Sequence, residues 1–202
     1  MFRKRPPESI YSTPNLITLL RLGASLAFFT LALLERNETY NFIGLALHWL
    51  GDVADGFVAR RFHQETILGA EIDIIADRVE FLFFFINFLF FHPQLYLPII
   101  VYLLDFAFVD FYLSYQFIKF DLISPNYFYK VDKNVYRFNY SPAGKFANST
   151  IVPLLLIFLP RWWIIALVWA LGLIGLKLFS FYLLNKKKNI DKNLSSSVKE
   201  SS

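Results

Sequence analysis

The stretch GDVADGFVARRFHQETILGAEIDIIADRVEF, residues 51–81, holds four aspartates, Asp52, Asp55, Asp73 and Asp77. Side chains three, four or seven residues apart share one face of an α-helix, so each half of the stretch predicts a helix with a carboxylate face. A short loop joins the two helices, which must therefore be antiparallel neighbours. The stretch thus predicts two acidic helix faces that confront each other.

Small residues accompany the aspartates on these faces. Gly56 and Ala59 lie on the face of the first pair, and Gly69 lies on the face of the second pair. Small side chains permit the close approach of another backbone or of a ligand.

The rest of the chain indicates a membrane protein. Of its 202 residues, 56% are hydrophobic and 24 are phenylalanines. Ordinary soluble domains are less apolar and more charged, so a lipid bilayer is the expected surrounding. The chain has no cysteine. Disulfides and thiolate metal sites are therefore excluded, and any metal must be held by oxygen or imidazole.

Stretches of about 20 apolar residues predict membrane spans. We expect an all-α, polytopic fold with six transmembrane helices, at about residues 15–34, 40–60, 67–91, 95–118, 142–159 and 162–184. Residues 1–14 are expected to form a short interfacial segment, residues 15–184 the transmembrane domain, and residues 185–202 a disordered basic tail.

Lysine and arginine collect in cytoplasmic loops. Here they gather in both tails and in the 60–66 and 119–141 loops, whereas the alternate loops carry only Arg36 and Arg161. We therefore expect both termini and the aspartates at the cytoplasmic face of an integral, multi-pass membrane protein.

Four carboxylates in a bilayer repel one another and are costly unless cations neutralise them. Carboxylate oxygens without thiols favour Mg²⁺, Mn²⁺ or Ca²⁺. Two divalent ions would balance four carboxylates, and paired metals assist displacement at phosphorus. Arg60 lies beside the cluster in sequence and could bind a phosphate oxygen.

Other interpretations of the aspartates remain open. They could form a structural network with Arg60, Arg61 and Arg78. They could also mark a divalent-cation pathway, or a membrane protein that binds metal without catalysis.

Several other polar residues lie in the predicted spans. Asp105 and Asp110 are five residues apart, so on a regular α-helix they point in different directions. Arg21 is expected to face the interior of the protein. His48 is interpreted as an ordinary histidine and not as a ligand.

The chain resembles the CDP-alcohol phosphatidyltransferase family in the run Asp52-x2-Asp55-Gly56-x2-Ala59-Arg60-x8-Gly69-x3-Asp73-x3-Asp77. TPNLITLLR, residues 13–21, is similar to the family's first-helix entry. The resemblance implies a six-helix membrane enzyme, commonly dimeric. Such enzymes transfer a phosphatidyl or substituted phosphoryl group from a CDP-linked donor to an alcohol and release CMP.

The resemblance also implies residue roles. Asp52, Asp55 and Asp73 would ligate two Mg²⁺ or Mn²⁺ ions, and Asp77 would complete the metal site and act as general base. The CDP pocket would be lined by Gly56, Ala59, Arg60 and Gly69. CDP-diacylglycerol, a small polar alcohol, membrane lipid and a second copy of the chain are the expected partners, and we expect no nucleic acid.

Sequence features favour more than one acceptor alcohol. The Gly-Lys pair at Lys145 resembles phosphatidylglycerophosphate synthases, whereas IDIIADR, with Arg78 after the fourth aspartate, resembles inositol-type transferases. An inositol-type and a glycerol 3-phosphate acceptor therefore stand nearly equal, with serine third. Arg78, Arg137 and Lys145 are the candidate acceptor-binding residues, because a phosphorylated acceptor needs cations.

Overall fold

The computed structural model describes residues 8–200, with the backbone alone for residues 190–200. All its regular elements are helices, which confirms the all-α prediction. In chain order they are α1 (Thr13–Leu34), α2 (Glu38–Arg61), α3 (Ile67–Phe91), η1 (Pro93–Leu95), α4 (Tyr96–Leu104), η2 (Asp105–Asp110), α5 (Phe111–Lys119), η3 (Pro125–Lys130), α6 (Lys133–Val135), η4 (Tyr136–Tyr140), α7 (Pro142–Ser149), α8 (Ile151–Phe158), η5 (Pro160–Trp162) and α9 (Trp163–Glu200).

Polar caps determine where the two acid-bearing helices begin. The Asn37 side chain accepts a 3.0 Å hydrogen bond from the Thr39 amide at the start of α2. The Thr66 hydroxyl accepts a 2.9 Å bond from the Gly69 amide at the start of α3. Each cap satisfies an amide that has no partner within its own helix, and so fixes the residue at which α2 or α3 begins.

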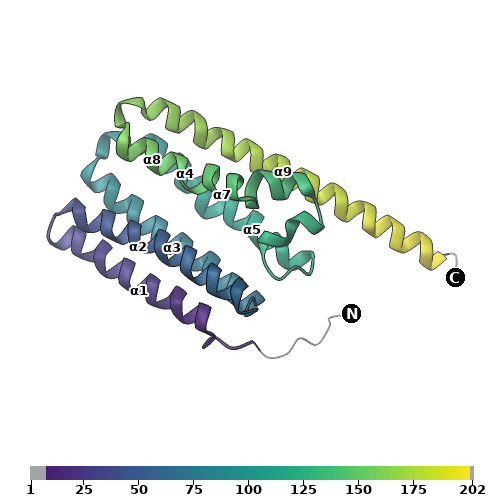
Figure 1. Ribbon diagram of the computed structural model, residues 1–202. Coiled ribbons are helices and arrows are strands. Elements are labelled where there is room, and N and C mark those ends of the chain that lie inside the picture. Colours follow the sequence, from purple (N-terminus) through teal and green to yellow (C-terminus); the bar gives the residue numbers. More distant parts are fainter. Residues whose placement is uncertain (1–7, 201–202) are drawn as a thin grey trace.

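The helices form two groups. α1, α2 and α3 pack against one another, and α9 packs against α4, η2 and α8 on the other side (Figure 1). Phenylalanines dominate the core between the groups. Phe84, Phe85 and Phe88 of α3 are buried there, together with Ile99 and Tyr102 of α4.

Close approach of α1 and α2 depends on a small residue. A Cβ added to Gly44 would lie 2.5 Å from the Phe29 ring. Below this contact, Asn87 of α3 donates to the Phe29 carbonyl at 2.7 Å and to Asn41 of α2 at 3.1 Å. These buried hydrogen bonds from the Asn87 side-chain amide connect the three helices far from the aspartates.

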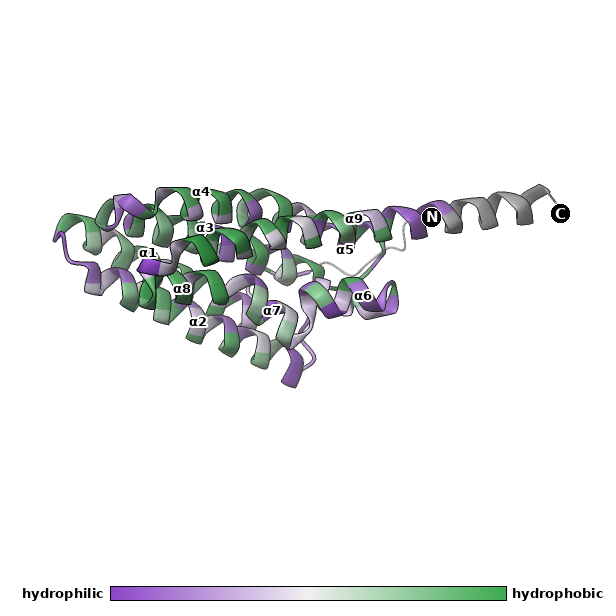
Figure 2. Cartoon of the chain, turned by 90° about the horizontal axis from the view of Figure 1, so that it is seen from above, coloured by the Kyte–Doolittle hydropathy of each residue, from purple (hydrophilic) through white to green (hydrophobic). Residues whose placement is uncertain are grey.

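Four helical stretches in the described part of the chain are long and apolar enough to cross a membrane. They are Thr13–Leu34, Glu38–Arg61, Pro93–Lys119 and Pro160–Asn189. Hydrophobic residues cover most of the helix lengths, whereas the region around α6 is more hydrophilic (Figure 2). These features are typical of an integral membrane protein.

The six predicted spans stay a prediction, because two of the six segments lack either the apolar composition or the length of a spanning helix. α3 is long enough at 25 residues, but it carries Glu71, Asp73, Asp77, Arg78 and Glu80. The segment 142–159 is divided at Thr150 into two helices of 8 residues each. A spanning helix needs about 20 residues, so neither short helix crosses a bilayer alone.

The C-terminal segment also differs from expectation. α9 continues to Glu200, whereas we expected a disordered tail from residue 185. Residues 1–7 of the predicted interfacial segment, with Arg3, Lys4 and Arg5, lie outside the described residues.

The loop region between α5 and α7 is fastened to the turn between α2 and α3. The Tyr127 hydroxyl of η3 donates a 2.6 Å hydrogen bond to Glu65. This bond, with a smaller effect of burial, raises the pKa of Tyr127 to about 12. The contact holds η3 beside the polar end of the acid-bearing helices.

Candidate active site

The acidic faces of α2 and α3 meet, as the sequence predicts. Asp52 and Asp55 come from α2 and Asp73 from α3, and each offers a carboxylate oxygen within 4.8 Å of the other two. Helix α1 closes the third side. Thr18 donates a 2.7 Å hydrogen bond to Asp55, which is 4% exposed. Three helices therefore define the position of these carboxylates.

A guanidinium from α1 lies between the two faces. Arg21 is 5% exposed, and its stem passes Gly51, where an added Cβ would lie 2.4 Å from Arg21 Cδ. Its Nη1 lies 3.6 Å from Asp52 and 3.7 Å from Asp55; its Nη2 lies 3.0 Å from Asp77, 3.3 Å from Glu80 and 3.4 Å from Asp73. Arg21 thus faces inward, as expected, and contacts all four aspartates.

This arrangement corrects the structural-network alternative in its details. The cation among the aspartates is Arg21, whereas Arg60 and Arg61 are exposed. Arg78 approaches the cluster at one point, with Nη1 3.8 Å from Asp77. One guanidinium among five carboxylates leaves a formal charge of −4.

The donor set fits divalent cations. The ligands on offer are carboxylate oxygens, which Mg²⁺ and Mn²⁺ prefer, and two such ions would neutralise the remaining charge. Asp52 and Asp73 keep partly exposed side chains, at 48% and 38%, so ions can reach them. Whether metals bind there stays a prediction.

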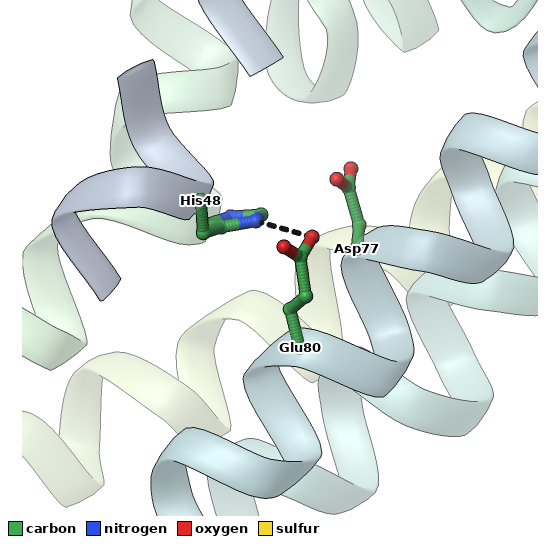
Figure 3. Close-up of side chains that lie close together, drawn as sticks. All are labelled: His48, Asp77 and Glu80. Atoms are coloured by element: carbon green, nitrogen blue, oxygen red, sulfur yellow. Dashed lines mark hydrogen bonds and ion pairs between the residues drawn. The ribbon is translucent and has the colours of Figure 1, made fainter. Parts of the chain in front are cut away.

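Below the aspartates lies a buried polar pair. His48 of α2 and Glu80 of α3 share a 2.9 Å hydrogen bond, and Asp77 points toward the same space from the preceding turn of α3 (Figure 3). His48 is 4% exposed and Glu80 is 1% exposed. The ring of His48 packs edge-on against Phe81 at 4.8 Å between centroids. This histidine, interpreted from sequence as ordinary, is therefore part of the site.

The predicted nucleotide-binding residues lie at the polar end of the two helices. The Arg60 guanidinium lies over Gly56, 3.1 Å from where a Cβ would stand. At Gly69 an added Cβ would lie 2.8 Å from the Asn15 side chain. Ala59 is half-buried in the last turns of α2. Gly56 thus leaves room for the Arg60 side chain, and Gly69 for the close approach of α1.

A second buried charge network lies behind Asp77. Arg78 pairs with Asp110, and Lys177 of α9 pairs with Asp105 and, at 3.2 Å, with the other oxygen of Asp110. Lys177 and Asp105 are 0% exposed.

The prediction that Asp105 and Asp110 point in different directions was wrong. Residues 105–110 form a π-helix, in which bonds run from residue i to i+5. The wider turn directs both carboxylates to Lys177. Asp110 thereby also pairs with Arg78. Because the charge of the Arg78 guanidinium is balanced by this carboxylate, Arg78 is less suited to bind an acceptor.

The other two predicted acceptor residues are exposed. Lys145 of α7 and Arg137 of η4 make no side-chain ion pair among the described residues. Lys145 is close enough to Asp52 and Asp110 to interact with both electrostatically. The structure therefore brings Lys145 near the aspartates, and leaves its charge available.

Sequence reasoning missed Thr18, His48, Glu80 and Lys177 as site residues. Lys177 carried a signal, since it is a lone cation within the hydrophobic stretch 163–184. An ionisable residue in such a stretch is costly and usually has a partner. Glu80 carried a similar signal, because it follows Asp77 by three residues on the same helix face.

Comparisons with known proteins relate the chain to one family. A family model described as CDP-alcohol phosphatidyltransferase matches residues 11–174. A protein of Aquifex aeolicus (strain VF5), named CDP-diacylglycerol–glycerol-3-phosphate 3-phosphatidyltransferase, is 34% identical over 95 residues, or 46% of this chain. The match spans 52%, about half, of that relative's length. No solved structure matches the chain significantly.

Proposed function

The chain belongs to the CDP-alcohol phosphatidyltransferase family, and from this premise we propose that it transfers a phosphatidyl group from CDP-diacylglycerol to a small polar alcohol in phospholipid biosynthesis. The observation that carries the proposal is the convergence of Asp52, Asp55 and Asp73, with oxygens within 4.8 Å of one another. This cluster lies in a helical bundle apolar enough for lipid.

The donor side of the site uses the acidic faces. Asp52, Asp55, Asp73 and Asp77 would hold two Mg²⁺ or Mn²⁺ ions. When bound, such ions supply Lewis-acid stabilisation of the negative charge that develops on the departing phosphate. Arg60 is exposed at the polar end of α2 and α3, where its guanidinium can bind a diphosphate oxygen. Gly56, Ala59 and Gly69 lie at the same end of the two helices and would line the nucleotide pocket there.

Asp77 is suited to accept a proton. Its side chain is 21% exposed, so an acceptor hydroxyl can reach it. Asp77 takes the hydroxyl proton as the alcohol oxygen forms a bond to the lipid-side phosphorus. The bond from that phosphorus to the oxygen of CMP breaks, and CMP leaves with the bonding electrons.

Glycerol 3-phosphate is the acceptor that we propose. The Aquifex aeolicus relative is named for that substrate. Lys145 provides an available positive charge near Asp52, which suits a phosphorylated alcohol. Arg137 is a second exposed cation. An inositol-type acceptor is the second candidate, since the run IDIIADR, with Arg78 after Asp77, resembles inositol-type transferases.

The membrane arrangement follows from the substrates. The acyl chains of the donor stay in lipid, whereas CMP and the alcohol are water-soluble. We propose a homodimer with both termini and the site at the cytoplasmic face, where the basic loops collect.

The experiment is an acceptor panel. The purified protein is incubated in lipid nanodiscs with CDP-diacylglycerol, Mn²⁺ and glycerol 3-phosphate, inositol, inositol phosphate or serine in turn. CMP and lipid product are measured together. We expect both with glycerol 3-phosphate. Metal flux into liposomes without CMP would favour a cation pathway, and metal binding without turnover on any alcohol would favour a non-catalytic protein.

A further inference from the structure

Arg21 competes for the oxygens that the proposed metal ions require. Its two terminal nitrogens lie between 3.0 and 3.7 Å from five carboxylates. A guanidinium and a divalent cation cannot share the same oxygens without mutual repulsion. The chain therefore needs a means of keeping Arg21 near the site without occupying it.

Glu80 differs from the aspartates in a way that meets this need. Its side chain is 0% exposed, whereas that of Asp52 is 48% exposed and that of Asp73 is 38% exposed. Its Oε2 accepts from His48 at 2.9 Å and lies 3.3 Å from Arg21 Nη2. Its Oε1 is buried and has no hydrogen-bond partner. Glu80 can thus accept a second hydrogen bond from the Arg21 guanidinium. The buried space beside Glu80 and His48 is the closed end of the site.

The charge balance also favours Glu80, and not the aspartates, as the partner of Arg21. Five carboxylates and one guanidinium carry a formal charge of −4, which two divalent ions would neutralise. Four aspartates then belong to the two ions, and Glu80 belongs to Arg21. A buried glutamate without its cation would be strongly destabilising, so this pair persists when the aspartates are occupied.

We propose that Glu80, oriented by His48, is the counter-ion that holds Arg21 at the closed end of the site and so leaves the four aspartates to divalent cations. Glu80, His48 and Arg21 are positioning residues. The inference rests on the proposed metal-dependent function and deepens it. Gly51 contributes by admitting the Arg21 stem, which passes so close that an added Cβ would overlap it.

His48, Asp77 and Glu80 could themselves be considered a metal site, since their ligand atoms lie within 4.8 Å of one another. The space is already used, however. Arg21 Nη2 lies 3.0 Å from Asp77 and 3.3 Å from Glu80, and Nδ1 of His48 is bonded to Glu80. The contacts favour an anchored arginine over a further cation.

The test measures Mn²⁺ binding by electron paramagnetic resonance on the full-length protein in nanodiscs, without substrate. Glu80→Gln keeps the side-chain shape and removes the charge that retains Arg21. We expect the Kd for Mn²⁺ to rise by about tenfold or more, within the usual range of coupling between two sites. In the double variant Glu80→Gln with Arg21→Met, the competing cation is gone, and we expect the Kd to return close to the wild-type value.

Glu71→Gln is the matched control, because it removes an acid of the same helix that makes no ion pair with Arg21 among the described residues; its Kd should not change. Thermal unfolding in EDTA gives a second readout. Arg21→Met should lower the Tm in EDTA, because five carboxylates then lack their cation, and Mn²⁺ should restore it.

Three results would overturn the inference. One is an unchanged Kd in Glu80→Gln, and another is a double variant that binds as weakly as the single one. The third is an additional Mn²⁺ ion that disappears in His48→Ala. Failure of the proposed function looks different: the wild-type protein would then bind no Mn²⁺ and release no CMP.

Discussion

Arg78 of α3 and Asp110 of η2 form an ion pair that joins the helix bearing Asp77 to the second group of helices. The other oxygen of Asp110 lies 3.2 Å from Lys177 of α9. A carboxylate held by two cations is fixed in orientation. Because Arg78 Nη1 lies 3.8 Å from Asp77, this network also fixes the surroundings of the proposed base.

Removal of Lys177 should destabilise the protein. Lys177→Met leaves the fully buried Asp105 without its cation, which we expect to lower the free energy of unfolding by about 3–5 kcal/mol. Denaturant unfolding in detergent micelles measures the effect. The exposed Lys119→Met is the control, and Lys177→Met combined with Asp105→Asn should recover part of the loss. Unchanged stability in Lys177→Met would show that the network is dispensable.

Asp77→Asn should abolish most turnover, because an amide cannot accept the acceptor proton. We expect kcat to fall by about 10²–10⁴-fold, the usual contribution of a general base. The fold and much of the Mn²⁺ binding should remain, since Asp52, Asp55 and Asp73 are intact. Steady-state CMP release and Mn²⁺ titration are the measurements. Full activity in this variant would remove Asp77 from the mechanism.

Asp52→Ala and Asp73→Ala should weaken metal and nucleotide binding together. The two carboxylates come from opposite helices and are the more exposed members of the cluster, at 48% and 38%. Calorimetric titration with CDP in Mn²⁺ and in EDTA tests the link. A nucleotide affinity that does not depend on divalent metal would contradict it.

Gly51→Ala should displace Arg21, because the new Cβ would lie 2.4 Å from Arg21 Cδ. Overpacking of this kind costs about 1–3 kcal/mol. Gly23→Ala is the control, since nothing lies within 4 Å of its Cβ, and alanine there should be neutral or slightly stabilising. Thermal unfolding compares the two. Equal behaviour would mean that α1 and α2 adjust around Arg21 freely.

Lys145→Ala should impair use of a phosphorylated acceptor. If Lys145 binds the acceptor phosphate, KM for glycerol 3-phosphate should rise by about 10–100-fold, as expected for a hydrogen bond to a charged group, with a smaller change in kcat. KM for CDP-diacylglycerol should stay near the wild-type value. The exposed Lys130→Ala is the control. A loss confined to kcat would place Lys145 elsewhere in the reaction.

The helices and the meeting of their acidic faces could be predicted from the sequence, because both depend on local periodicity. The spacing of Asp52 with Asp55, and of Asp73 with Asp77, fixes a helix face whatever the surroundings. The short loop between α2 and α3 then forces the faces together. The caps Asn37 and Thr66 act over two and three residues, so they too are visible in the sequence.

The partners of the aspartates could not be predicted in the same way. Arg21 is 56 residues from Asp77 in the chain, and Lys177 is 72 residues from Asp105. Such pairs depend on how the helices pack. The π-helix at residues 105–110 was missed because a pattern analysis assumes 3.6 residues per turn. The break at Thr150 was missed because hydropathy does not record backbone geometry.

The central claim is that the aspartates of α2 and α3 hold divalent cations at which a phosphatidyl group is transferred. Its most direct test is the rate of CMP release from CDP-diacylglycerol and glycerol 3-phosphate as Mn²⁺ is titrated into the EDTA-treated, wild-type protein. We predict no release in EDTA, saturable release with Mn²⁺, and none when the alcohol is left out. A rate in EDTA equal to that in Mn²⁺ would contradict the claim.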